Sequence, residues 1–275
     1  MTHHGTAVSG ATQGMLFTLV VLVAVGVYLT GVEASRRRGR AWPAIRIVAW
    51  MLGCLALGWG VRPLVSAGHD RMFTDHMMTH VLIGMGGPTL LALARPVTLL
   101  LRALPQRGAR GLAAVLRSTP VRVVTHPVVA AVLDVGGLWL LYTSPLYHAM
   151  HASAWVSALV HVHVFLAGYV FAVAILEPEP TAHPVSYPAR AAVLVASIAA
   201  HDILAKHLYT QDHLGSSPDD VRTGAMLMYY LGDAVEIALI ILLCLAWYRS
   251  ANRPATPTRH HRSSPSRLTE THDGV

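Results

Sequence analysis

Two histidines of this chain, His76 and His80, stand four residues apart in a stretch that is also rich in methionine. On a helix this spacing puts both imidazoles on one face, one turn apart, where they can share a metal ion. Met72 and Met77 add thioethers beside the pair. Because imidazole and thioether without a carboxylate cage suit copper better than magnesium or calcium, the sequence predicts a copper site.

A third ligand is expected from another part of the chain. His163 and His201 are the candidates, and His161 is an alternative to His163 that the spacing does not exclude. A single histidine at a membrane interface is more often hydrogen-bonded than a metal ligand. The grouping of most of the 17 histidines toward one side of the predicted topology, described below, favours the metal-binding interpretation.

Ionisable side chains also occur within or beside long apolar stretches. They are Asp75, Arg95, Asp134, Asp202, Asp233 and Glu236. Each costs a few kcal/mol at membrane depth, so it must pair or face water. We expect Arg95 to pair with Asp134. Asp233 and Glu236 are three residues apart on one face, and they are expected to face the histidines and orient metal-bound imidazoles. Mutual neutralisation that fixes helix packing is the alternative.

Seven apolar stretches must position these groups. Each approaches the ~20 residues that a helix needs to cross ~30 Å of hydrocarbon. Hydrophobic residues make up 53% of the chain and charged residues 13%, which is too little charge for a soluble protein of 275 residues. Backbone groups in lipid must pair within their own segment, so an all-α polytopic membrane protein with seven transmembrane helices is predicted. The stretches run from Met15 to Val32, Ile45 to Val65, Met77 to Leu101, Pro127 to Thr143, Trp155 to Leu176, Ala189 to Leu208 and Ala225 to Trp247.

The basic residues predict the orientation. With the N-terminus outside, sixteen of the 21 basic residues fall on the inner side and four on the outer side, as the positive-inside rule requires. The net charge of +7 then reports topology and implies no nucleic-acid partner. Residues 1–14 are expected to be an extracytoplasmic segment, residues 15–248 the transmembrane domain, and residues 249–275 a disordered cytoplasmic tail.

Several of these motifs resemble those of one known family. The run from Asp75 to His80, followed by Gly-Gly-Pro88 and by Ala-Arg-Pro96 through Pro105, resembles the third-span signature of CtaG-type cytochrome c oxidase assembly factors. The resemblance covers about residues 70 to 247 and continues through these positions: His126–Ala130, Trp139–Tyr147, Ala158–His163, Gly168, Ala200–Asp202, Asp220, Gly224 and Met226–Tyr230. One departure is Val160, where relatives carry an acid, so both His161 and His163 stay open as the ligand.

The resemblance implies a seven-span protein of the bacterial plasma membrane that takes part in copper insertion into a haem-copper oxidase. Its expected partners are the oxidase subunits, an extracytoplasmic copper donor and the lipid bilayer. Two other classes stay open, a proton-coupled transporter that uses the acids as a relay and a haem- or quinone-binding redox protein. The sequence contains no evident nucleophile-base set or phosphate-binding loop, so we expect no enzymatic activity.

Overall fold

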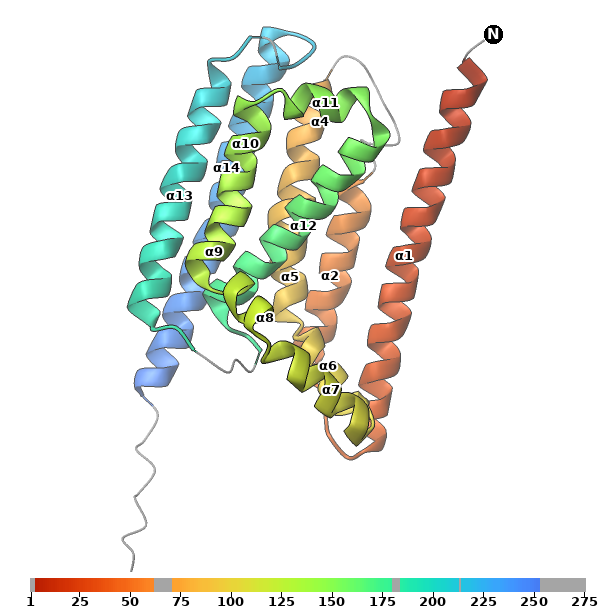
Figure 1. Cartoon of the computed structure of the whole chain (residues 1–275), viewed down its shortest axis with the longest axis vertical. Coiled ribbons are helices and arrows are strands. Elements are labelled where there is room, and N and C mark those ends of the chain that lie inside the picture. The colour runs from red at the N-terminus through yellow and green to blue at the C-terminus, as the bar shows by residue number, and fades with distance from the viewer. Residues whose placement is uncertain (1–2, 62–70, 180–183, 213, 253–275) are drawn as a thin grey trace, which may run out of the picture.

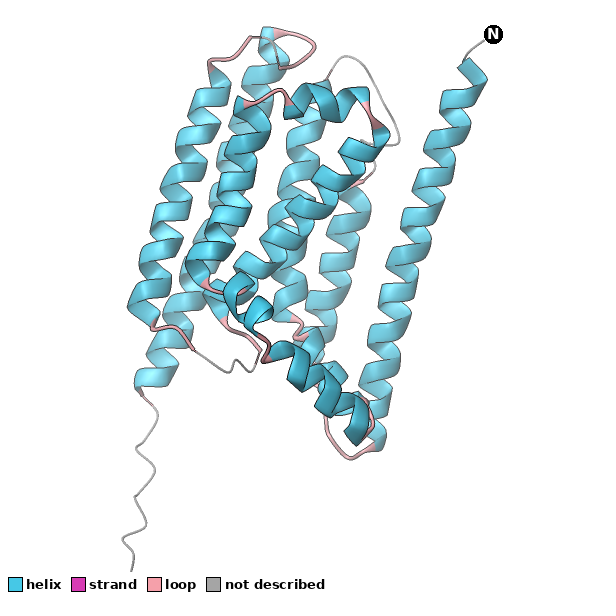
Figure 2. Cartoon of the chain, in the orientation of Figure 1, coloured by secondary structure: helices cyan, strands magenta, loops and turns pink. Residues whose placement is uncertain are grey.

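The structure is a computed structural model that describes residues 3–61, 71–179, 184–212 and 214–252. All regular secondary structure in these ranges is helical, which confirms the all-α prediction (Figures 1 and 2). The helices pack side by side, with α1 at one edge of the bundle (Figure 1). Their bounds are α1 His3–Arg37, α2 Ala44–Gly60, α4 Met72–Thr79, η1 His80–Gly86, α5 Gly87–Leu93, α6 Pro96–Ala103, α7 Gln106–Leu116, α8 Thr119–Val124, α9 Pro127–Ala131, η2 Val132–Gly136, α10 Gly137–Thr143, α11 Leu146–Ala152, α12 Ala154–Leu176, α13 Tyr187–Tyr209 and α14 Pro218–Ala251.

Four of the described helices are long and apolar enough to cross a membrane, and two bent helix pairs bring the number to six if each pair is one span. The four are α1, α12, α13 and α14; the pairs bend by 41° at residues 94–95 and by 78° at residues 144–145. Helix α2 is apolar but has 17 residues. Seven spans and their orientation therefore stay a prediction. Residues 62–65 of the predicted second span and residues 253–275 of the predicted tail lie outside the described residues.

The predicted third span, residues 77–101, is not one continuous helix. Arg95 has a left-handed backbone (φ 54°) and is followed by Pro96, which lacks the N–H that a continuing helix would need. A new helix, α6, begins at Pro96. Its first free N–H groups, those of Val97 and Thr98, donate to the carboxylate of Glu179, and so does the Thr98 hydroxyl. The predicted third span is thus a pair of helices with a break at residues 94–95, and that this pair forms one span stays a prediction.

Two π-helical segments interrupt the bundle, η1 directly after α4 and η2 between α9 and α10. Short π-helical turns often occur at functional sites because they shift side chains out of the α-helical register. The first of them begins at His80 and the second contains Asp134. Helix α12 crosses the segment α4–η1–α5 obliquely (Figure 1). At this crossing a Cβ added to Gly168 would lie 1.8 Å from the carbonyl oxygen of Gly84, so the two backbones meet directly.

Candidate metal centre

The start of α4 is anchored by a carboxylate from another helix. Asp220, in the first turn of α14, accepts hydrogen bonds from the backbone N–H of Phe73 at 2.9 Å and of Thr74 at 3.0 Å. It also accepts from the hydroxyls of Thr74 and Ser216. A negative charge at a helix N-terminus satisfies free N–H groups and complements the helix dipole. This contact fixes the position of α4 one turn before His76.

His76 is buried and lies among aromatic rings. Its Nε2 is 2.9 Å from the hydroxyl of Tyr142, which is in turn 3.9 Å from the sulfur of Met77. The ring centroid of His76 is 5.4 Å from Tyr147, 6.0 Å from His151 and 6.1 Å from His161. The thioether and imidazole that the sequence placed side by side are therefore joined through one tyrosine hydroxyl.

His80, one turn further on, has no partner for either ring nitrogen among the described residues. The side chain is only 5% exposed, so water does not replace the missing partner freely. Buried polar atoms in proteins are nearly always hydrogen-bonded, and an unpartnered one costs about 1–3 kcal/mol. An imidazole that is buried and unpartnered at both nitrogens is thus the strongest sign of a ligand in this part of the molecule.

His161 of α12 is held in one tautomer. Its Nδ1 lies 2.7 Å from the carbonyl oxygen of Ser157, and a carbonyl only accepts, so Nδ1 carries the proton. The lone pair then stands on Nε2, which is buried without a hydrogen-bond partner in the described structure. Metal-binding histidines are commonly oriented in this way, by a hydrogen bond from the other ring nitrogen.

His201 of α13 is buried next to an acid. Its Nδ1 is 3.2 Å from Oε1 of Glu236, although the two groups are not aligned as a hydrogen bond, and its Nε2 has no described partner. Its ring centroid is 6.0 Å from that of His80. Glu236 thus lies where it can orient the His201 imidazole and balance a cation beside it.

The spacing of these rings fits shared ligation. A metal ion lies ~2.0–2.1 Å from an imidazole nitrogen, so two rings on one ion have centroids about 5–6 Å apart. The pairs His76–His161 and His80–His201 lie at 6.1 and 6.0 Å. His76, His80 and His161 line one cavity of about 10 Å³, and His80 and His201 line an adjoining cavity of about 30 Å³. His80 therefore lines both cavities and lies beside both pairs of rings.

Acidic side chains lie around His201. Asp134 lines the larger cavity with Glu236 and interacts electrostatically with His201. Asp202 interacts with Asp233 and Glu236, and ligand atoms of His201, Asp202 and Glu236 lie within 4.8 Å of one another. The structure does not pair Arg95 with Asp134. Arg95, at the left-handed turn after α5, instead interacts electrostatically with Glu179.

Three predicted site residues lie apart from the cluster. His163 is exposed, and its Nε2 is 3.1 Å from the carbonyl oxygen of Leu133, one helical face away from His161. Met72 is 39% exposed in the first turn of α4. Asp75 is half-buried on α4, and among the described residues no printed contact joins it to the histidines. Of the two α12 histidines, the geometry brings only His161 to the site.

Other residues of the site are ones that the spacing argument did not select. Tyr142, Tyr147 and His151 surround His76, and Asp220 anchors its helix. The sequence carried one signal for the first three, an aromatic and histidine-rich stretch around the Ser144-Pro145 turn. Asp220 belongs to the positions that carry the family resemblance, but nothing local indicated its capping role, because its partners lie 146 and 147 positions away in the chain.

The capping role of Asp220 can be tested with Asp220→Asn. Asparagine presents an amide NH₂ to backbone N–H donors and removes the charge, so we expect a loss of about 1–3 kcal/mol in the free energy of unfolding. The matched control is Asp219→Asn, because Asp219 is adjacent, is 93% exposed and forms a surface ion pair with Arg222. A stability loss of equal size in the control would contradict the capping role. Detergent-denaturation curves of the two variants provide the measurement.

These features define a helical membrane protein whose buried cluster of histidines is gathered from three parts of the bundle. The family model of the cytochrome c oxidase caa3 assembly factors (Caa3_CtaG) matches residues 26–250. The chain belongs to this family, which confirms the resemblance seen in its motifs.

Relatives with similar sequences occur in mycobacteria. The chain is 32% identical over 269 residues to uncharacterized proteins of Mycobacterium bovis and Mycobacterium tuberculosis, and 30% identical over 273 residues to one of Mycobacterium leprae. The alignments cover 89%, 89% and 92% of this chain but only 40%, 40% and 41% of the relatives. The chain thus spans well under half the length of these relatives. No solved structure matches it.

Proposed function

We propose that this protein binds copper at the cluster of His76, His80, His161 and His201 and delivers it to a haem-copper oxidase during assembly. The observation that carries the proposal is the set of buried imidazole nitrogens without hydrogen-bond partners on His80, His161 and His201. Structural histidines in a helical core would be expected to use those nitrogens for hydrogen bonds. A copper ion would satisfy them together.

The donor set supports copper rather than a hard cation. Imidazole nitrogens make up most of the donor set, and the hydroxyl of Tyr142 links the Met77 thioether to His76. Glu236 and Asp134 lie beside His201, where they would balance the charge of the ion. Copper is the cargo in this proposal. Exposed His151, whose ring is 6.0 Å from His76, provides a rim position from which an ion could pass to a partner.

The proposal places the protein in the bacterial plasma membrane with seven spans and the N-terminus outside. Helix α2 would then be a short span completed by residues that follow Gly60, and each bent pair would be one span. With this orientation the start of α4 and the histidines face the outside, and the basic residues of α7 and α8 face the cytoplasm. Copper from an extracytoplasmic donor would reach the site without crossing the membrane, and the oxidase subunits would receive it there.

The decisive experiment compares metal binding with oxidase maturation. Purified protein in detergent, loaded with copper and desalted, is expected to retain copper near stoichiometrically without a haem spectrum. In cells, His161→Leu should leave the oxidase subunits present but poor in copper and weakly active. Normal oxidase copper in that strain, with copper still lost from the purified variant, would contradict delivery and favour the transporter interpretation of the acids.

A further inference from the structure

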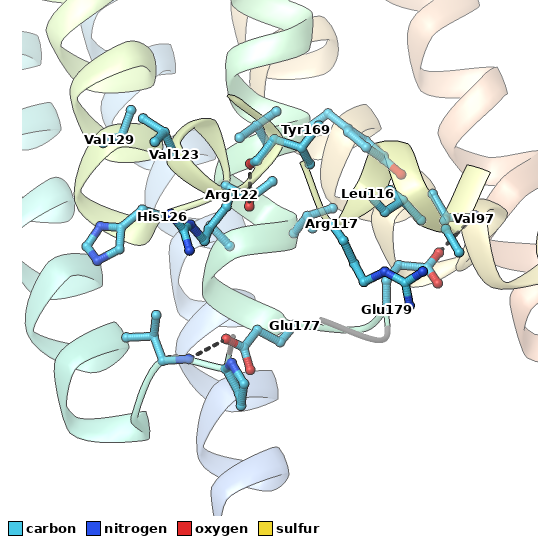
Figure 3. A pocket seen from close by; sticks show the side chains of 18 of the residues that line it. Val97, Leu116, Arg117, Arg122, Val123, His126, Val129, Tyr169, Glu177 and Glu179 are labelled. Atoms are coloured by element: carbon cyan, nitrogen blue, oxygen red, sulfur yellow. Dashed lines mark hydrogen bonds between the residues drawn. The ribbon is translucent and has the colours of Figure 1, made fainter. Parts of the chain in front are cut away.

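A large cavity lies among α6, α7 and α8, at the opposite end of the bundle from α4, which carries His76 (Figure 1). It has a volume of about 750 Å³ and is lined by residues of α6, α7, α8, α9 and α12 (Figure 3). Most of its lining is apolar, with side chains such as Val129, Val170 and Val173. This volume falls in the range of ~300–1,000 Å³ that is typical of small-molecule sites.

Two arginines lie on the α7–α8 side of this cavity. Arg117 is the C-cap residue directly after α7 and Arg122 lies on α8, and both line the cavity (Figure 3). Neither makes an ion pair or a side-chain hydrogen bond with any other described residue. Helices α7 and α8 contain no buried residue, so they lie on the surface of the bundle.

The two acids of the cavity are already matched by their own neighbours. Glu177 lies 3.6 Å from the buried Arg190 and accepts a hydrogen bond from the backbone N–H of Val185. Glu179 accepts the bonds that cap α6, and burial raises its pKa against the lowering effect of those bonds. The uncompensated charge of the site is therefore positive and comes from Arg117 and Arg122.

We propose that this cavity binds an anionic phospholipid of the adjacent leaflet, with its phosphate on Arg117 and Arg122 and an acyl chain in the apolar interior. Guanidinium groups bind phosphate oxygens with charge-assisted, often bidentate hydrogen bonds. Basic pockets between transmembrane helices are suited to such headgroups. The apolar lining explains the choice of a lipid over a free phosphate, since a free anion would leave most of the cavity without a matching group.

The experiment uses the full chain in detergent, exchanged with phosphatidylglycerol or phosphatidylcholine and examined by native mass spectrometry. We expect phosphatidylglycerol to be retained in preference to phosphatidylcholine. Arg117→Gln combined with Arg122→Gln should reduce phosphatidylglycerol retention by roughly 10- to 30-fold, since each basic residue contributes a few-fold or more. The matched control is Arg107→Gln with Arg110→Gln, which removes the same charge from α7 at positions that do not line the cavity.

A second variant tests the apolar part of the site. Val173→Trp fills the interior without changing charge, and it should also lower phosphatidylglycerol retention while the protein elutes as a single species. Equal losses from the Arg107–Arg110 and Arg117–Arg122 variants would overturn the proposal in favour of non-specific surface charge. Equal retention of the two lipids, or displacement of lipid by glycerol phosphate, would overturn it as well. Copper retention is measured in the same samples, so failure here is distinct from failure of the copper proposal.

Discussion

Replacing His80 with leucine should lower copper affinity by roughly 100-fold or more. Removal of a group that merely orients a ligand costs about 10–100-fold, so removal of a ligand that lines both cavities of the site should cost at least the upper value. In the absence of copper the variant should be as stable as the wild type or more stable, because two buried nitrogens without described partners are removed. A loss of affinity without a loss of stability identifies a ligand rather than a structural histidine.

The matched control for this variant is His163→Leu. His163 is a histidine of the same bundle, but it is exposed and its Nε2 lies against the Leu133 carbonyl. It should keep nearly full copper affinity in a competition titration with a chelator. A double variant of His80 and His201 should lose little more than His80→Leu alone if both bind one ion. Equal losses in the His80 and His163 variants would refute the assignment of the site.

Gly168→Ala should be among the most damaging single-methyl additions in the chain. Its Cβ would stand 1.8 Å from the carbonyl oxygen of Gly84, and neither atom can rotate away because one belongs to the backbone and the other is fixed to it. Overpacking typically costs 1–3 kcal/mol, and here we expect about 3 kcal/mol or more of the free energy of unfolding. Moving α12 away from η1 would also separate His161 from His80, so copper retention should fall with stability.

Gly58→Ala is the control for this substitution. Gly58 lies in α2, and a Cβ there would meet nothing within 4 Å. Alanine favours a helix over glycine by up to about 1 kcal/mol, so this variant should be unchanged or slightly more stable. Thermal unfolding followed by fluorescence-detected size-exclusion chromatography measures both variants. A Gly168→Ala protein with wild-type stability would show that the crossing is looser than described.

The two helix starts of the broken third segment, those of α4 and α6, are both capped by a carboxylate. Asp220 caps α4 and Glu179 caps α6, and each acid comes from a distant part of the chain. A helix start without its own side-chain cap needs such a partner, because its first N–H groups otherwise lack acceptors. The arrangement fixes both ends of the segment that carries His76 and His80, which is what a site with defined ligand positions needs.

Composition and local spacing determined the class of this protein and part of its site. Long apolar stretches in a chain with few charges could only be helices in lipid, and the structure is all-helical. The four-residue interval between His76 and His80 is a local property, so it survives in the structure across the change from α4 to η1. The family resemblance rested on the same local motifs.

Only the tertiary structure decided which distant groups meet. His161 and His163 are two residues apart and point to different helical faces, so the packing of α12 selects His161. Arg95 could pair with Asp134 by depth alone, but at the left-handed turn after α5 it interacts electrostatically with Glu179 instead. The caps by Asp220 and Glu179 join residues more than 80 positions apart. Such contacts depend on how whole helices are rotated about their axes and on the angles at which they cross. The sequence gives the period of each helix, but it does not give the direction that each helical face takes in the bundle.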